Sequence, residues 1–415
     1  MIRAVKGTRD LLPPDTAVWN RVERIAREVL RAYNYHEIRT PILEETQLFA
    51  RGVGQETDIV SKEMYTFEDR DGSSLTLRPE NTASVIRAYI EHRLDQRPGV
   101  MKLYYIGPMF RRERPQKGRY RQFFQIGAEA IGSESPFVDA EVIEMVAELL
   151  TRTGLTGFTL LINSVGCRNC RPQFIAKLRE ALEPVAPALC IDCQRRAETN
   201  PLRVLDCKVP EDQAAIDALP KIADFLDDAS RAHFAAVRAA LDACGVPYTV
   251  NPRLVRGLDY YTRTTFEFIH GGLGAQNALL GGGRYDGLSE AIGGPKAPGI
   301  GFAIGADRLI LTLQAQKEAQ QGTPLADVYI APLGEPQQAE SLLLARELRR
   351  EGLRVELGDG TFRLKKSFEM GNKVARAIVL FGEDEAKSGI VTVKDFQTGE
   401  QKKIARTELA TVLKK

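Results

Sequence analysis

Hydrophobic residues recur every three or four positions in several parts of the chain, which is the spacing of one face of an α-helix. Residues 16–33 show this pattern and predict an amphipathic helix. Residues 135–154 show it again, with Ser135 or Asp139 as the residue that caps the start of this second helix.

Other segments have the short, β-rich patterns of strands. Residues 37–43 (EIRTPIL) predict a strand, with Pro41 at an edge or interface position. Residues 73–94 predict a strand, a turn at Arg78–Asn81 and a helix. Residues 101–131 contain two β-rich runs on either side of the sequence RPQKG, which predicts a long hairpin.

The same patterns divide the chain into domains of mixed α and β structure. Residues 167–250 contain all six cysteines and several helical stretches, so we expect an inserted helical subdomain within a first domain, residues 1–318. Residues 319–325 belong to a polar stretch and predict a linker. Residues 326–415 then alternate strand and helix, which predicts a small α/β domain with a partly parallel sheet.

The composition restricts where the chain works and what it binds. Its 57 Lys and Arg residues nearly balance 55 Asp and Glu residues, so any surface that binds nucleic acid must be local. The sequence contains no hydrophobic run of membrane-spanning length and does not start with a signal-peptide pattern. We therefore expect a cytoplasmic protein with reduced thiols and no membrane partner.

The most basic stretch lies in the predicted hairpin, where six of the eleven residues from Arg111 to Arg121 are Lys or Arg. In a strand, residues of the same parity share a face. The odd-numbered face combines guanidiniums, carboxylates, an amide and an aromatic ring, in Arg111, Glu113, Arg119, Arg121, Phe123, Gln125 and Glu129. These groups suit a nucleotide, because arginine binds phosphate oxygens and an aromatic ring stacks on a base.

The even-numbered residues from Phe124 to Ala130 are apolar and are expected to pack inward. The alternative for the whole segment is a solvated hairpin held by surface ion pairs.

Four cysteines have the spacing of a metal site. Cys167-x-x-Cys170 and Cys190-x-x-Cys193 are separated by 19 residues, which fits a four-thiolate structural zinc site. Four reduced thiols without a metal are the alternative. Cys207 and Cys244 remain outside this pattern.

Five stretches, in order, resemble the class II aminoacyl-tRNA synthetases and, within them, the histidyl-tRNA synthetase family. They are EIRTPILEETQLF, GPMFRRERPQKGRYRQFFQIGAEAIG, LVRGLDYYT, GGGRYDGL and GIGFAIGADRL. The resemblance covers nearly the whole chain. It implies an antiparallel catalytic sheet flanked by helices, an anticodon-binding domain in residues 326–415, and a homodimer with Pro41 at its interface.

The activity that this resemblance implies is ATP-dependent attachment of L-histidine to tRNA(His) through a histidyl-adenylate, with Mg²⁺ on the phosphates. Arg111 and Arg256 would act at the α-phosphate, and Arg308 would bind the γ-phosphate. The remaining ATP contacts would come from Glu113, Arg121 and Phe123. The histidine pocket would contain Glu80, Asn81, Thr82, Gln125, Glu129, Tyr260 and Tyr261.

The resemblance also leaves a non-catalytic alternative. A related fold serves as the histidine-sensing regulatory subunit of ATP phosphoribosyltransferase, and that relative lacks the C-terminal domain and the catalytic arginines. Arg111, Arg256 and Arg308 are present here and residues 326–415 follow them, which favours the enzyme.

Overall fold

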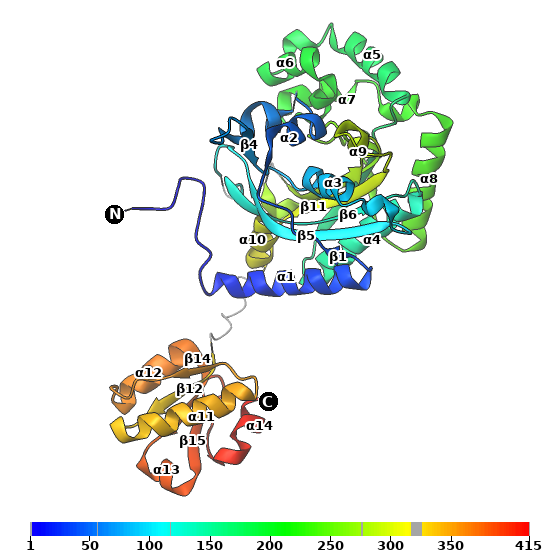
Figure 1. Ribbon diagram of the computed structural model, residues 1–415. Coiled ribbons are helices and arrows are strands. Elements are labelled where there is room, and N and C mark those ends of the chain that lie inside the picture. Colours follow the sequence, from blue (N-terminus) through cyan, green and yellow to red (C-terminus); the bar gives the residue numbers. More distant parts are fainter. Residues whose placement is uncertain (1, 56, 117, 275–276, 317–325, 415) are drawn as a thin grey trace. The chain divides into compact units, whose positions relative to one another are not determined.

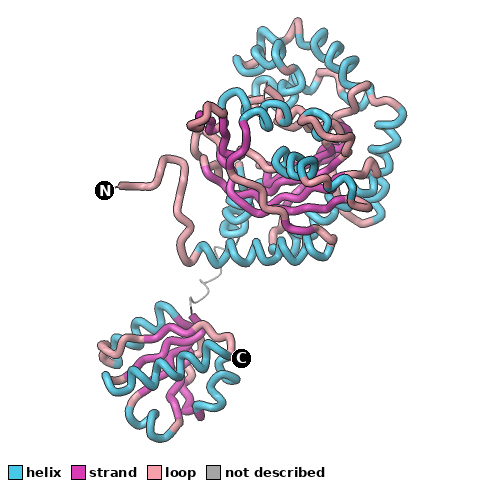
Figure 2. The backbone as a smooth tube through the Cα atoms, in the orientation of Figure 1, coloured by secondary structure: helices cyan, strands magenta, loops and turns pink. Residues whose placement is uncertain are grey.

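The computed structural model describes residues 2–55, 57–116, 118–274, 277–316 and 326–414. The chain divides into two compact units, Met1–Ala319 and Gln320–Lys415. Each unit contains a main sheet that helices cover (Figures 1 and 2). The predicted linker at 319–325 falls outside the described residues.

The first unit is built on an eight-stranded sheet whose inner pairs are antiparallel. In spatial order its strands are β1 (His36–Glu37), β5 (Met101–Phe110), β6 (Gln122–Ile131), β11 (Gly299–Gly305), β10 (Ala278–Arg284), β9 (Thr262–His270), β7 (Phe158–Ser164) and β8 (Thr249–Val250). At the two edges, β1 runs parallel to β5 and β8 runs parallel to β7. The predicted hairpin is confirmed as β5 and β6.

Helices cover one face of this sheet (Figure 1), and their apolar side chains pack against it. They are α1 (Asp15–Ala32), α4 (Pro136–Thr153), α8 (Asp228–Ala243) and α10 (Ala306–Gln316). Trp19 and Val22 of α1 and Val146 of α4 share one core with Ile126 and Ala128 of β6. The even-numbered residues of β6 therefore face this core, as predicted, and its odd-numbered residues point to the opposite face.

The opposite face carries shorter elements. They are α2 (Thr46–Gly52), α3 (Thr82–Glu91), α9 (Leu288–Ala291) and a small sheet of β2 (Leu43–Glu45), β4 (Ser74–Leu77) and β3 (Tyr65–Glu68). Val85 and Ile86 of α3 pack against Tyr105 and Met109 of β5. The residues of β5 and β6 that do not reach the first core thus lie beside α3.

The predicted strand around Pro41 is interrupted. β1 ends at Glu37 and β2 begins at Leu43. Proline has no N–H to donate to a neighbouring strand, and the carbonyls of Thr40 and Pro41 accept hydrogen bonds from the Arg78 guanidinium at 2.9 and 3.3 Å. The prediction of one continuous strand was wrong because a side chain takes these backbone acceptors.

Ser135 caps α4, and Asp139, the other candidate, does not. The Ser135 hydroxyl accepts a hydrogen bond from the N–H of Phe137 at 3.3 Å. Asp139 is fully buried inside α4, where its carboxylate lies 2.5 Å from Nη2 of Arg284 and 2.8 Å from Nε2 of His233. Asp139 therefore neutralises a buried cation that joins α4 to the sheet.

The cysteine-rich segment is helical and has a core of its own. Its helices are α5 (Cys170–Leu182), α6 (Ile191–Thr199) and α7 (Gln213–Asp217), which lie together at one end of the first unit (Figure 1). This core runs along the chain from Cys170 to Leu226. In α8, by contrast, Val237 and Leu241 belong to the core of the large sheet. The separate core is thus shorter than the segment 167–250.

The second unit is a five-stranded sheet with helices. Its elements along the chain are β12 (Ala326–Pro332), α11 (Gln338–Arg350), β13 (Val355–Leu357), α12 (Leu364–Val374), β14 (Ala375–Phe381), α13 (Glu383–Ser388), β15 (Ile390–Asp395), β16 (Gln401–Ala405) and α14 (Leu409–Leu413). β13, β12 and β14 are parallel, and β15 and β16 continue the sheet in antiparallel fashion. This confirms the predicted partly parallel α/β arrangement. Across the described part of both units, no helix combines the length and apolar character needed to cross a membrane.

Candidate active site

A cavity of about 830 Å³ opens on the face of the large sheet that carries α3. Residues of β6, β10 and β11 line it together with residues from the hairpin tip and from the segments 203–210 and 255–261. The predicted ATP, catalytic and histidine residues line it as well, with the exceptions of Asn81 and Arg121. The fold therefore gathers groups that are more than 200 positions apart in the sequence.

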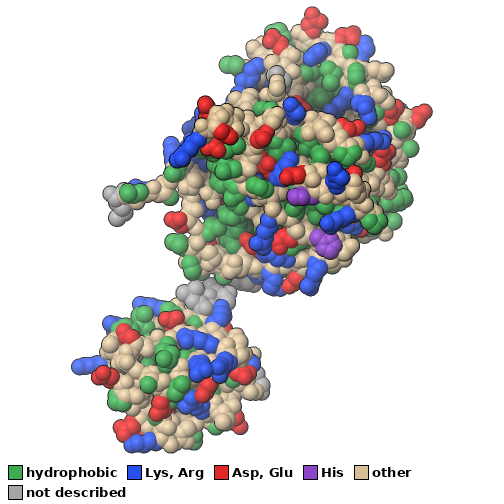
Figure 3. All heavy atoms as spheres, viewed as in Figure 1, with side chains coloured by type: hydrophobic (Ala, Val, Ile, Leu, Met, Phe, Trp, Pro, Cys, Tyr) green, Lys and Arg blue, Asp and Glu red, His purple; other side chains and the backbone are tan. Residues whose placement is uncertain are grey.

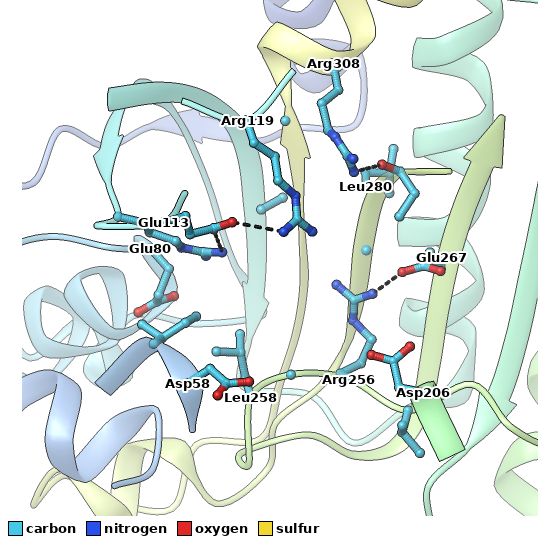
Figure 4. Close-up of a pocket in the computed structure, with 18 of the residues that line it drawn as sticks. Asp58, Glu80, Glu113, Arg119, Asp206, Arg256, Leu258, Glu267, Leu280 and Arg308 are labelled. Carbon is cyan, nitrogen blue, oxygen red and sulfur yellow. Dashed lines mark hydrogen bonds and ion pairs between the residues drawn. The ribbon is translucent and has the colours of Figure 1, made fainter. Parts of the chain in front are cut away.

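One part of the cavity is rich in arginine. Arg119 from the hairpin, Arg256 from the segment before β9 and Arg308 from α10 extend toward the same space (Figure 4). Nη1 of Arg256 lies 2.5 Å from Oε1 of Glu267, and Arg308 donates to the carbonyl of Ala278. Burial lowers the pKa of Arg308, and the nearby charge of Arg119 lowers it further. An anion bound between these two cations would relieve their repulsion.

Arg111 and Phe123 face each other beside this group. The Arg111 guanidinium lies 5.3 Å from the centre of the Phe123 ring, and its Nε donates to the carbonyl of Pro79 at 2.9 Å. Glu113 lies between two cations, 3.8 Å from Nη1 of Arg111 and 3.0 Å from Nη1 of Arg119. The odd-numbered face of the hairpin thus forms a charged wall of the cavity.

The other part of the cavity is acidic and aromatic. Glu129 is fully buried, and its two carboxylate oxygens accept hydrogen bonds of 2.7 Å from the hydroxyls of Thr82 and Tyr285. Burial raises the pKa of Glu129 to about 8, although these two hydrogen bonds oppose the shift. A carboxyl group with this pKa changes between its neutral and its ionised form near neutral pH.

Glu80 lies close to Glu129 but has a local structural role. Its carboxylate accepts the N–H of Thr82 at 2.7 Å and the N–H of Ala83 at 3.0 Å, which caps the start of α3. Burial raises the pKa of Glu80 as well. Capping therefore fixes this carboxylate at the edge of the cavity.

Tyrosine rings close the acidic part. The centre of the Tyr260 ring lies 4.7 Å from that of Tyr261 and 5.9 Å from that of Tyr285. Among the buried polar atoms of the lining, the hydroxyl of Tyr105 and Oε1 of Gln125 find no hydrogen-bond partner among the described residues. A buried polar atom without a partner carries a free-energy penalty, which a polar ligand in the cavity would remove.

Two glycines of the sheet make room for the functional side chains. A Cβ atom built on Gly281 of β10 would lie 2.0 Å from Nη2 of Arg256. One built on Gly301 of β11 would lie 1.8 Å from Oε2 of Glu129. Both distances are far below van der Waals contact, so Arg256 and Glu129 hold these positions because the strands beneath them carry no side chain.

Two predicted site residues lie elsewhere. The side chain of Asn81 is buried next to α3, where its Oδ1 accepts a hydrogen bond from the Thr40 hydroxyl at 2.7 Å. Arg121 donates through Nη1 to the carbonyl of Lys6 at 3.3 Å, and its own N–H donates to the carbonyl of Gly7 at 2.7 Å. Asn81 and Arg121 thus hold neighbouring segments in place instead of lining the cavity.

Several lining residues were not foreseen from the sequence. They are Glu63, Tyr105, Asp206, Glu267 and Tyr285. Tyr285 lies in the stretch GGGRYDGL, between Arg284 and Asp286 and with glycines on both sides. This pattern could have marked it as a candidate site residue. Glu267 lies in an ordinary strand pattern and offers no such signal, because it meets Arg256 only in the folded chain, where Glu267 lies opposite Gly281 and the Arg256 guanidinium lies over that glycine.

This arrangement can be compared with known proteins. The family model described as histidyl-tRNA synthetase matches residues 7–309, and the model described as anticodon-binding domain matches residues 327–415. The chain belongs to the histidyl-tRNA synthetase family. The antiparallel catalytic sheet and the separate C-terminal α/β unit agree with this membership.

Individual relatives of the family match over the full length. A histidine–tRNA ligase of Koribacter versatilis is 67% identical over 422 residues, which cover 99% of this chain and 95% of the relative. One from Solibacter usitatus is 66% identical over 415 residues and covers 100% and 99%. The crystal structure of apo Staphylococcus aureus histidyl-tRNA synthetase has a TM-score of 0.81 and 40% identity, with complete coverage of both chains.

The predicted four-cysteine metal site is not formed. Cys167 and Cys170 lie together with Asp227, whereas Cys190 and Cys193 lie with Cys207 and Asp212. Within each group the potential ligand atoms are all within 4.8 Å of one another, and the four predicted thiols do not form such a group. The spacing therefore predicted that the thiols of each C-x-x-C pair meet, but the prediction that the two pairs join in one site was wrong.

Proposed function

We propose that this protein joins L-histidine to tRNA(His) in two steps. Histidine and ATP first form histidyl-adenylate and diphosphate, and the histidyl group then passes to the 3′ end of the tRNA with release of AMP. The observation that carries the proposal is a single cavity with cationic groups in one part and buried carboxyl and tyrosine groups in the other. These two parts suit a triphosphate and a polar amino acid held side by side.

The arginines suit the first step because negative charge develops on the phosphoryl oxygens. As the histidine carboxylate attacks the α-phosphorus in line, Arg111 and Arg256 would stabilise that charge. Arg308 would bind the γ-phosphate. The ion pair between Arg256 and Glu267 fixes the guanidinium before substrates bind, so little reorganisation remains for the reaction.

The adenine of ATP would stack on Phe123, with Glu113 near the base. Glu113 is held by Arg119, and Phe123 by packing against Arg111. Mg²⁺ would enter with the triphosphate and shield its β- and γ-oxygens. Magnesium commonly takes most of its oxygens from phosphate and water, with one or two protein carboxylates, and the lining offers Glu63, which interacts electrostatically with Arg111, as such a carboxylate.

The acidic part would select histidine. Its imidazole needs a polar partner at each ring nitrogen, and Glu129 and Tyr261 are the groups we assign to this recognition. Gln125 would bind the amino acid through the oxygen that has no partner among the described residues. A site built to hydrogen-bond its substrate rejects apolar analogues strongly, because its buried polar groups would then remain unpaired.

The second unit, residues 326–415, would bind the anticodon. It contains 16 basic and 14 acidic residues, so bulk charge alone does not attract tRNA to it. On the face seen in Figure 3, basic and acidic side chains are interspersed over both units. Recognition of tRNA would then depend on local contacts, of the kind that side chains make with unpaired bases.

We also propose that the active form is a cytoplasmic homodimer. Ile42 and Leu43 are 41% and 44% exposed beside Pro41, and a second copy of the chain would cover them. Light scattering of the purified protein tests this directly, with twice the chain mass as the expected result.

Histidine-dependent exchange between diphosphate and ATP tests the catalytic proposal. We expect exchange with histidine, none with phenylalanine or leucine, and a loss of roughly a hundredfold or more in Arg256→Ala. Arg238→Ala is the matched control, because Arg238 is on α8 and does not line the cavity. A protein that binds histidine but shows no exchange would instead be a histidine-sensing regulator, and the comparisons do not favour that alternative.

A further inference from the structure

Three cysteines and one aspartate meet at the wall of the cavity. Cys190 immediately precedes α6, Cys193 lies in its first turn, Cys207 follows a short 3₁₀ turn (Pro201–Asp206), and Asp212 ends another (Pro210–Asp212). Their sulfur and carboxylate oxygen atoms all lie within 4.8 Å of one another. We propose that Cys190, Cys193, Cys207 and Asp212 bind one structural zinc ion.

The distances within the group fit a tetrahedral ion. Zinc lies about 2.3 Å from a thiolate and about 2.0 Å from a carboxylate oxygen, so ligands at the corners of the tetrahedron are about 3.5 to 3.8 Å apart. Sγ of Cys190 is 3.9 Å from Sγ of Cys207, and Sγ of Cys207 is 3.3 Å from Oδ2 of Asp212. Both distances are close to those of a tetrahedral site, and the remaining pairs lie within 4.8 Å.

Three of the four residues are buried, and backbone N–H groups point at the ligand atoms. Cys193 is fully buried, and Cys207 and Asp212 are 3% and 4% exposed. The N–H of Val209 points at the sulfur of Cys207 from 3.4 Å, and the N–H of Cys190 lies 3.1 and 3.2 Å from the two oxygens of Asp212. Amide donors aimed at the ligand atoms are the outer contacts that orient the ligands of a metal site.

The other thiol group has a simpler explanation. Asp227 caps α8 by accepting the N–H of Ser230 at 2.8 Å, and its own N–H points at the sulfur of Cys170 from 3.3 Å. Cys167 donates to the same aspartate at 3.1 Å. This group offers three ligands, one of which already terminates a helix, so it serves as the comparison for the proposed site.

The proposed ion would hold a wall of the active-site cavity. Cys190, Cys207 and the neighbouring Asp206 and Lys208 are among the lining residues. The carbonyls of Leu205 and Cys207 each accept hydrogen bonds of 3.3 Å from Arg253, three residues before Arg256. Four protein ligands leave no open position for substrate, so the ion would have a structural and not a catalytic role.

Metal analysis of the full-length protein, purified without chelators, tests the proposal. We expect one zinc per chain in the parent protein and in Cys167→Ser, and less than a few tenths in Cys207→Ser. After exchange with Co²⁺ alone, the parent and Cys167→Ser should show the strong visible absorption of tetrahedral cobalt and the thiolate-to-cobalt band in the near ultraviolet. Cys207→Ser should show neither.

Asp212→Asn provides a second test in case Cys207→Ser fails to fold. Its amide oxygen can still accept the Cys190 N–H, so the local fold has a replacement contact. Even changes outside the ligand shell lower metal affinity roughly 10- to 100-fold, so loss of a ligand should lower zinc affinity at least tenfold in a chelator competition.

Three results would overturn the proposal. The first is parent protein with less than a few tenths of an equivalent of zinc that also takes up no added zinc. The second is zinc that survives both Cys207→Ser and Asp212→Asn but is lost in Cys167→Ser. The third is a disulfide between Cys190 and Cys207 in metal-free protein, shown by thiol counting and peptide mass analysis.

Discussion

Replacing Glu129 with glutamine should make the protein more stable and less active. The Glu129 carboxyl is buried between the hydroxyls of Thr82 and Tyr285, and burial raises its pKa from 4.5 to about 8. Glutamine has nearly the same shape and no proton to lose. Both hydroxyls can donate or accept, so each can still pair with the amide.

The size of the stability effect follows from the pKa difference. The folded protein retains the Glu129 proton up to about pH 8, whereas the unfolded chain releases it near pH 4.5, so the unfolded state binds fewer protons in this window. The free energy of unfolding therefore falls as the pH rises, by about 1.4 kcal/mol per pH unit. The loss amounts to about 3 kcal/mol at pH 7 and roughly 5 kcal/mol above pH 8.

Thermal unfolding of the parent protein and E129Q between pH 5 and 9 measures this effect. The two midpoints should nearly coincide at pH 5, separate steadily toward pH 8 with E129Q the higher, and stay apart above it. Glu134→Gln is the control, since Glu134 and Lys296 form an exposed pair 2.6 Å apart and such pairs contribute little.

The activity of E129Q completes the prediction. Because Glu129 is assigned as a hydrogen-bond partner of the histidine ring, kcat/KM for histidine in the exchange assay should fall roughly 10- to 100-fold, the range expected when a buried polar partner is lost. Equal midpoints for E129Q and the parent at pH 8 would mean that Glu129 ionises without penalty. That result would refute the reasoning from burial.

Three further changes test other parts of the structure. Gly281→Ala should lower the rate of histidine-dependent exchange at least tenfold, because the added methyl group displaces the Arg256 guanidinium. Gly287→Ala is the control, since a Cβ atom at Gly287 meets no atom within 4 Å and should leave the rate unchanged. Equal rates in the two variants would contradict the steric argument. Asp139→Asn should lower the free energy of unfolding by about 2–3 kcal/mol, measured by denaturant unfolding, because it removes one of the two carboxylates that pair with the buried Arg284 and leaves Asp286 as the other; a loss below about 1 kcal/mol would contradict this. Truncation after residue 318 should retain histidine-dependent exchange and lose most tRNA charging, and an equal loss in both assays would argue against separate roles for the two units.

The parts of the site that depend on local sequence patterns, such as the alternation of residues in a strand, could be predicted. Alternation in the hairpin assigned Phe123 and Gln125 to the cavity and Ile126 to the core, because neighbouring residues of a strand must face opposite ways. The same reasoning failed for Arg121, whose partners are the carbonyl of Lys6 and the backbone of Gly7. The alternation along a strand predicts which face of the sheet a side chain lies on. It does not predict which distant segment of the chain packs on that face.

The cysteines show the same limit more sharply. A C-x-x-C pair at the start of a helix brings its two thiols together through local geometry, and in this respect both pairs behave as the spacing predicts. Which further side chains lie beside each pair depends on the tertiary structure of the segments that follow α6 and precede α8. Cys207 returns to the pair at Cys190 and Cys193, so the residue that the spacing left over becomes the one that completes a group of three thiols. Sequence spacing can therefore suggest that a metal is bound, while the choice of ligands is made by tertiary structure.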